Sequence, residues 1–86
     1  MASSAAVTTG QVKAARALLG WSQGDLADAS GVSHPSIKRL EADTGDLGGY
    51  AETQAKIVAA LEAAGVEFTN GGEPGVKLKL KKGRRR

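Results

Sequence analysis

The sequence of 86 residues contains no cysteine, one histidine and two prolines. The absence of cysteine excludes disulfide bonds, thiolate metal ligands and cysteine nucleophiles. The lone histidine, His34, has no second histidine with which to bind a metal ion, and its neighbour Ser33 lacks the orienting geometry of a catalytic triad. We therefore expect no enzymatic activity, no cofactor and no metal site.

Aromatic residues and long apolar runs are also scarce. Only Trp21, Tyr50 and Phe68 are aromatic, and alanine supplies 15 of the apolar residues. Alanine is the best helix former, so this composition favours packed helices over a β-sandwich or barrel, and the length is that of one small domain. No run approaches the roughly 20 apolar residues of a membrane helix, and the first ten residues lack the features of a signal peptide. We expect a cytoplasmic protein.

Positive charge is scarce in the body of the chain and concentrated at its end. Residues 1–76 carry five lysines and arginines and all nine acidic residues, whereas residues 77–86 carry seven basic residues and no acid. Basic ends of this kind usually contact polyanions such as nucleic acid or an acidic protein surface. We expect residues 81–86 to form a basic tail that adds affinity for nucleic acid.

Four stretches of the sequence repeat apolar residues at the 3.6-residue period of a helix. Their boundaries follow from two pairs with capping-box spacing, Thr8 with Gln11 and Ser22 with Asp25, and from glycines that end helices. The expected helices cover about residues 10–19, 22–30, 34–42 and 50–64, after a disordered segment at residues 1–8.

After the fourth of these stretches the apolar period changes from 3.6 to 2. The alternating apolar residues are Val66, Phe68, Val76, Leu78 and Leu80. Between the two alternating runs, residues 70–75 have a turn-forming composition. The pattern predicts a β-hairpin over residues 66–80 with one apolar and one charged face. Its apolar stripe is a candidate surface for dimerisation, as is the fourth helix.

The second and third expected helices meet at a tight turn. In this turn Gly31 supplies the positive φ and Val32 can fill the angle between the helices. Ser33 is a good N-cap for the third helix, and Pro35 fits its first turn. Two short helices joined in this way have helix-turn-helix geometry. The outer face of the third helix carries His34, Pro35, Ser36, Lys38 and Arg39.

The residues of this unit resemble those of the phage-repressor family of helix-turn-helix proteins (Cro/cI type, also called XRE). The agreement in spacing and residue type runs Arg16-x-x-x-Gly20-x-Ser22-Gln23-x-x-Leu26-Ala27-x-x-x-Gly31-Val32-Ser33, then Ile37-x-x-Leu40-Glu41. The resemblance covers about residues 10–64. It implies a mainly α fold, with a four-helix, lambda-repressor-like helix-turn-helix domain at residues 9–65, and the hairpin resembles extensions of some small relatives.

In that family the third helix enters the major groove of DNA, and the first residue of the second helix contacts phosphate. Carried over by position, the resemblance places Gln23 on a phosphate and the outer face of the third helix on the bases. Pro35 departs from the amide or hydroxyl side chain common at its position, so an apolar contact, for instance to a thymine methyl, replaces a hydrogen bond. The DNA-binding residues so implied are Gln23, Ser33, His34, Pro35, Ser36, Lys38 and Arg39.

Simpler roles are open to several of these side chains. Lys38 and Arg39 could form a solvated face, but they are two of only five cations in an acidic body, so DNA contact is favoured. We expect Glu41 to hold a backbone turn as part of the scaffold and Trp21 to anchor the core.

Together these features predict a sequence-specific, DNA-binding transcriptional regulator, by default a repressor, that binds a paired operator in double-stranded DNA as a homodimer. One alternative is a protein-interaction module of the antitoxin or anti-activator type that has kept the fold, which the acidic body supports. The other is a non-specific nucleic-acid binder driven by the basic tail.

Overall fold

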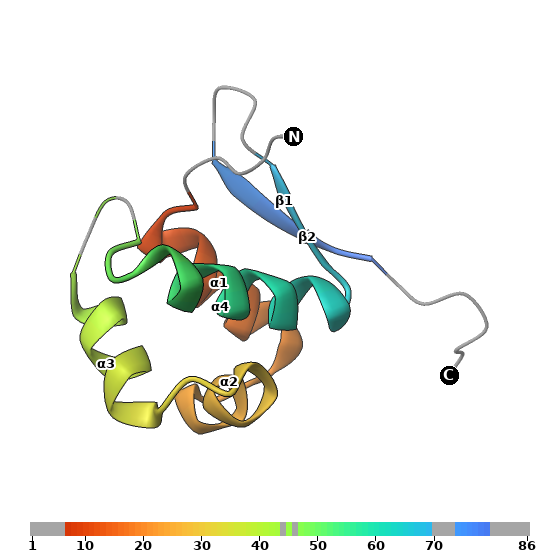
Figure 1. The fold of residues 1–86 in the computed structure, drawn as a ribbon. Coiled ribbons are helices and arrows are strands. Elements are labelled where there is room, and N and C mark those ends of the chain that lie inside the picture. Colours follow the sequence, from red (N-terminus) through yellow and green to blue (C-terminus); the bar gives the residue numbers. More distant parts are fainter. Residues whose placement is uncertain (1–6, 44, 46, 70–73, 80–86) are drawn as a thin grey trace.

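The computed structural model describes residues 7–43, 45, 47–69 and 74–79. It contains four helices followed by an antiparallel two-stranded hairpin (Figure 1). The elements are α1 (Thr9–Leu19), α2 (Gln23–Ser30), α3 (His34–Ala42), α4 (Ala51–Ala63), β1 (Val66–Thr69) and β2 (Gly75–Leu78). The predicted fold class is confirmed, and each helix begins and ends within one residue of expectation. None of the helices in the described ranges has the length and apolar character needed to span a membrane.

The first two helices begin at the capping boxes predicted for them. The Thr8 hydroxyl accepts the Gln11 N–H at 3.0 Å, and the Gln11 side chain accepts the Thr8 N–H at 2.9 Å. Ser22 and Asp25 exchange the same pair of bonds at 3.0 and 2.9 Å. Each box satisfies backbone donors that the first turn of a helix leaves without a partner, so the starts of both helices are fixed by local sequence.

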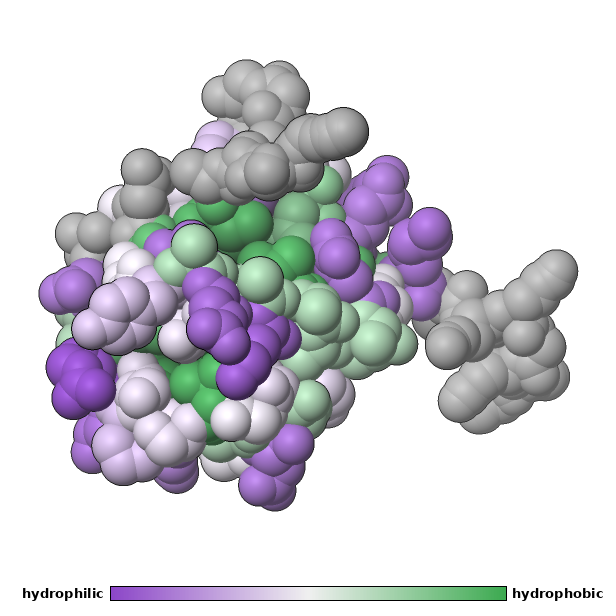
Figure 2. All heavy atoms as spheres, viewed as in Figure 1, coloured by the Kyte–Doolittle hydropathy of each residue, from purple (hydrophilic) through white to green (hydrophobic). Residues whose placement is uncertain are grey.

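The core is small and aliphatic. Its buried apolar residues are Val12, Ala15, Leu26, Val32, Ile37, Leu47, Ile57, Leu61 and Val66. Helix α4 packs on α2, and the hairpin packs on α1 and α4. Trp21 is partly buried against this cluster, as expected of a core anchor. On the face shown in Figure 2, apolar side chains reach the surface only in patches between hydrophilic ones.

The start of the fold lies earlier in the chain than expected. Residues 1–8 were predicted to be disordered, but the Val7 carbonyl accepts the Leu47 N–H at 2.9 Å, and the Thr9 N–H donates to the Gly45 carbonyl at 2.8 Å. Val7 also packs against the core. The prediction was therefore wrong for residues 7 and 8, because the α3–α4 loop supplies backbone partners that local sequence does not reveal. Residues 1–6 lie outside the described residues.

The apolar face of the hairpin packs mainly against its own chain. In the β1–β2 register Val66 pairs with Leu78 and Phe68 with Val76, so these four side chains share one face. Val66 is buried, and Phe68 and Val76 are partly buried against the core. Only Leu78 of this set is classed as exposed, at 37%. The stripe is thus less available for dimerisation than the sequence suggested. Leu80 and the basic tail lie outside the described residues.

Candidate nucleic-acid interface

The turn between α2 and α3 has the expected geometry. Gly31 adopts a left-handed conformation with φ 78°, and its N–H donates to the Ala27 carbonyl at 2.9 Å to close α2. Val32 is buried where the two helices meet, as predicted. Ser33 caps α3 by accepting the Ser36 N–H at 3.3 Å. The angle between the helices is therefore held by one glycine, one buried side chain and one cap.

Helix α3 has a buried side and an exposed side. Its inner side buries Ile37 and Glu41. The side chains predicted to read DNA lie on the other side: His34, Pro35, Lys38 and Arg39 are exposed and Ser36 is half-buried. Within the described residues neither Lys38 nor Arg39 forms an ion pair, so both charges face solvent. The structure thus brings the predicted reading residues together on one accessible surface.

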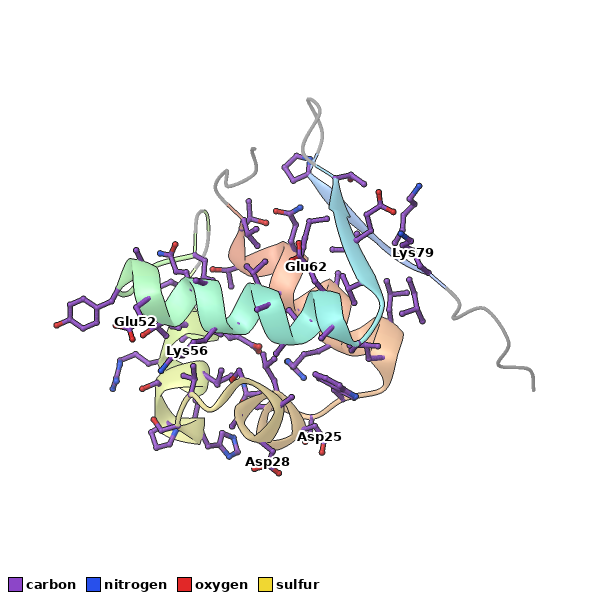
Figure 3. The ribbon with its side chains drawn as sticks, turned by 45° about the vertical axis from the view of Figure 1, so that its right-hand side comes forward. Asp25, Asp28, Glu52, Lys56, Glu62 and Lys79 are labelled. Carbon is purple, nitrogen blue, oxygen red and sulfur yellow. The ribbon has the colours of Figure 1, made fainter. Side chains whose placement is uncertain are left out.

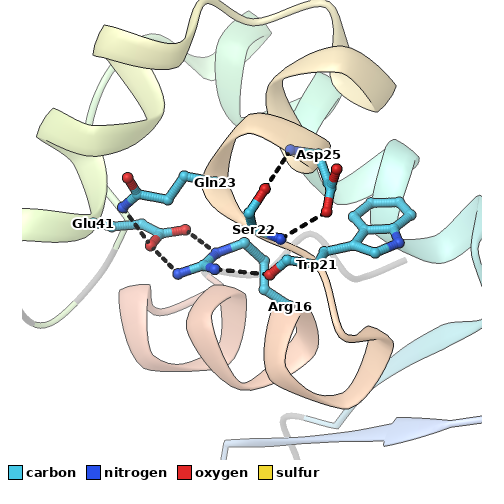
Figure 4. Close-up of polar contacts among 6 residues, drawn as sticks. All are labelled: Arg16, Trp21, Ser22, Gln23, Asp25 and Glu41. Carbon is cyan, nitrogen blue, oxygen red and sulfur yellow. Dashed lines mark hydrogen bonds and ion pairs between the residues drawn. The ribbon is translucent and has the colours of Figure 1, made fainter.

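A buried carboxylate ties the three helices of this region together (Figure 4). Glu41 of α3 receives two hydrogen bonds from the Arg16 guanidinium of α1, at 2.6 Å from Nη2 and 2.8 Å from Nε. Arg16 Nη1 also donates to the Trp21 carbonyl at 3.0 Å. Burial by itself raises the pKa of Glu41, but the hydrogen bonds from Arg16 and Gln23 outweigh it and hold the pKa below its ordinary value.

Glu41 was expected to hold a backbone turn, and this part of the prediction was wrong. Its partners are side chains, although the role is still structural. Neither Arg16 nor Glu41 was among the predicted site residues, yet both stand at the ends of the motif that carries the family resemblance. Glu41 follows Ile37 by four residues and so lies on the same inner side of α3. That spacing was the available signal that this acid is buried.

Gln23, the predicted phosphate contact, occupies the first position of α2 and is half-buried. Its amide nitrogen donates to Glu41 Oε1 at 3.1 Å, so its side chain is oriented by the same carboxylate that holds Arg16. An amide nitrogen carries two hydrogens, and this bond uses one of them. The second hydrogen can still serve a phosphate oxygen at the start of the helix.

A shallow groove runs between the start of α2 and the start of α3. The residues that line it include Gly24, Asp25, Asp28, Ser33 and His34. A Cβ on Gly24 would lie 3.9 Å from the His34 ring, so the imidazole lies close over the first turn of α2. Asp25 and Asp28 lie on the exposed side of α2 (Figure 3). Their negative charge disfavours phosphate in the groove itself and leaves Lys38 and Arg39 as the cationic part of the surface.

Comparison with known proteins agrees with this geometry. A family model described as helix-turn-helix, of the Cro/cI type, matches residues 12–48. The match begins in α1, includes α2, the turn and α3, and ends in the loop before α4. No curated protein matches the chain.

Proposed function

We propose that the chain is a sequence-specific, DNA-binding repressor, because a Cro/cI-type helix-turn-helix family model matches its residues 12–48. In this proposal α3 lies in the major groove and the bound protein blocks transcription by occupying the promoter. The observation that supports this proposal is the exposed side of α3, where the side chains of Lys38 and Arg39 face solvent. The inner side of the helix is fixed by the hydrogen bonds of Glu41 with Arg16 and Gln23.

Each exposed side chain of α3 has a role in the proposal. Arg39 reads a guanine, because its planar fork can donate to O6 and N7 together. Pro35 makes an apolar contact, for example with a thymine methyl. Lys38 contacts phosphate as a point charge. The remaining contacts to DNA come from Gln23, Ser33, His34 and Ser36.

The proposal includes a homodimer on a paired operator. A single helix-turn-helix unit makes few base contacts, and two units on half-sites about 34 to 36 Å apart supply the missing specificity. The surfaces open to such a dimer include the outer side of α4, where Ala51, Ala55 and Ala59 are exposed, and the part of the hairpin around Leu78.

The experiment that tests the function is a competition titration. Fluorescent DNA from immediately upstream of the coding sequence is bound by the full chain and competed with the same DNA or with DNA of mixed sequence. Preferential competition by the upstream DNA supports the proposal. Equal competition by both indicates a non-specific binder, and nuclease protection of the upstream fragment locates the operator when binding is specific.

A protein-interaction module is the second candidate. It is favoured by the acidic groove beside α3, where Asp25 and Asp28 lie next to the first residue of the reading helix. Acidic side chains at this place oppose phosphate and suit a basic protein partner. Absence of DNA binding in the titration, together with a folded chain, supports this candidate over the repressor.

A further inference from the structure

Strand β2 has an outer edge that faces away from β1. The Lys79 N–H donates to the Gly65 carbonyl at 2.7 Å, which makes these two residues a hydrogen-bonded pair of the antiparallel ladder. Because such pairs alternate with non-hydrogen-bonded ones, the N–H and C=O groups of Val76 and Leu78 point away from β1. No other segment in the described ranges supplies a hydrogen-bond partner for these outward groups. The edge is therefore a template for one more strand.

The side chains along this edge differ between the two faces of the strand. Lys77 and Lys79 are exposed on the face away from the core, because successive side chains of a strand point to opposite faces. Neither lysine forms an ion pair with another described residue. Leu78 lies on the opposite, apolar face and is 37% exposed.

The apolar face of the edge continues onto α1. The Gln11 amide donates to the Gly75 carbonyl at 2.9 Å and holds the start of α1 against the start of β2. From there α1 and β2 run side by side in the same direction in Figures 1 and 3. Seven residues of helix and three residues of strand each advance about 10 Å, so Leu18 stands level with Leu78. Leu18 is 45% exposed, so two leucines are open to a partner at this end of the edge.

A second copy of the chain is a poor partner for the edge. To pair with both Val76 and Leu78 in antiparallel order, a second β2 would place the partner's Lys77 directly opposite Lys77. Like charges in opposed positions destabilise a pair of strands, and edge lysines discourage association between like edges. A strand with acidic side chains at alternate positions has the opposite effect, because its carboxylates lie beside Lys77 and Lys79.

We infer that the outer edge of β2 binds an extended segment of a partner protein in which acidic and apolar residues alternate. The segment pairs with Val76 and Leu78 as an added antiparallel strand. Its acidic side chains lie beside Lys77 and Lys79, and its apolar side chains cover Leu78 and Leu18. The strands pack on α1 and α4, whereas α3 packs on α1 and α2, so this surface is separate from the proposed DNA-binding face and does not depend on it.

Binding of a short peptide to the full chain tests this inference. The probe is a fluorescent peptide, capped at both ends, in which glutamate and valine alternate, and anisotropy measures its dissociation constant. The control peptide has the same composition, with all glutamates in one half and all valines in the other. We expect the alternating peptide to bind about tenfold more tightly than the control, and more weakly as salt rises. Equal affinity for both peptides would show that charge alone is recognised and would overturn the inference.

Methylation of the peptide backbone separates strand pairing from charge and leaves the protein unaltered. In the antiparallel ladder the valines share a face with Val76 and Leu78, so the valine N–H groups donate to the edge and the glutamate N–H groups point away. N-methylation of the valines should weaken binding by about tenfold, and N-methylation of the glutamates should leave most of it. The inference is wrong if the two methylated peptides bind equally. This comparison needs no variant of the protein to fold.

Variants of the edge give matched expectations. Leu78→Pro removes an outward N–H that β1 does not use, and its control, Leu78→Ala, removes only the side chain. The proline variant should bind the alternating peptide about two- to tenfold more weakly than the alanine variant, as expected for one hydrogen bond. Lys77→Gln should weaken binding about two- to fivefold, and Glu67→Gln, directly across the ladder from Lys77, should strengthen it. Lys56→Gln, at an exposed position of α4, is the control for charge and should bind like the wild type. Wild-type affinity in Lys77→Gln would contradict the inference.

The oligomeric state of the chain tests the competing occupant. Light scattering gives the mass in solution of the wild type and of Leu78→Pro. We expect the same mass for both, because the edge does not hold a second copy. A wild-type dimer that becomes a monomer in the proline variant would overturn the inference, because a second chain would then occupy the edge.

Discussion

Arg16 of α1 and Glu41 of α3 form a two-pronged ion pair, with nitrogen–oxygen distances of 2.6 and 2.8 Å. The Glu41 side chain is 3% exposed and the Arg16 side chain 18% exposed, so the pair is largely shielded from water. It joins α1 to α3 across 25 residues of sequence. The position of α3 relative to the rest of the domain therefore depends on this contact.

Removing one partner of the pair should destabilise the fold. Arg16→Met leaves the Glu41 carboxylate buried without its cation, which we expect to lower the free energy of unfolding by about 3 kcal/mol. The double variant Arg16→Met, Glu41→Leu removes both charges and should recover most of this loss. Urea unfolding followed by circular dichroism measures the two single variants, Arg16→Met and Glu41→Leu, and the double variant. A double variant whose loss equals the sum of the single variants would contradict the coupling.

The same carboxylate should make stability depend on pH. The pKa of Glu41 is below its ordinary value of 4.5 in the folded protein, so folding favours the ionised form. The stabilising contribution is complete above the unfolded pKa and is lost as the pH falls through the folded pKa. Melting temperatures measured across this acidic range should fall less steeply for Glu41→Gln than for the wild type. Glu62→Gln, at an exposed position of α4, is the control and should keep the wild-type profile.

Arg39 should contribute to sequence choice rather than to general affinity. Arg39→Ala should weaken binding to the protected upstream sequence by about 1 to 3 kcal/mol and binding to mixed-sequence DNA far less. Fluorescence anisotropy with both DNAs measures the difference. The side chain is exposed, so the melting temperature should not change. Equal losses on the two DNAs would show that Arg39 contacts only phosphate.

Replacing Gly24 of α2 and its cap residue Gly31 by alanine should change the stability of the fold in opposite directions. Gly24 lies inside the helix with room for a Cβ, whose nearest neighbour would be the Ser22 hydroxyl at 3.6 Å, so Gly24→Ala should stabilise the fold by roughly 0.5 to 1 kcal/mol. Gly31 has open space around it but a φ of 78°, so Gly31→Ala should destabilise by about 1 to 2 kcal/mol through the backbone alone. Thermal unfolding of the two variants measures whether stability rises for Gly24→Ala and falls for Gly31→Ala.

Local sequence predicted the parts of this fold that are held by local contacts. The capping boxes at Thr8 and Ser22 and the left-handed cap at Gly31 each involve residues at most four positions apart, so their spacing is visible in the sequence. For the same reason the helix-turn-helix unit could be recognised, and the exposed face of α3 followed from the two apolar positions on its inner side.

What the sequence did not reveal are contacts between distant segments. Leu47 lies in a glycine-rich loop but is 5% exposed, and Gln54 holds that loop by donating to the Leu47 and Gly48 carbonyls at 2.7 and 3.0 Å. Val7 was missed because its partner is this same loop. Glu41 was assigned a local role because its cation comes from another helix. In each case the periodicity of one segment carries no information about the segment that packs against it.

Gln11 makes the longest-range polar contact described for this fold. Besides its part in the cap of α1, its amide nitrogen donates to the Thr69 and Gly75 carbonyls at 3.2 and 2.9 Å, which are 58 and 64 residues further along the chain. During synthesis on a ribosome, these acceptors are made after α1, α2 and α3. The nascent helix-turn-helix unit can thus form before its N-terminal helix is anchored at the hairpin. The anchored state is reached only when β1 and β2 have been made.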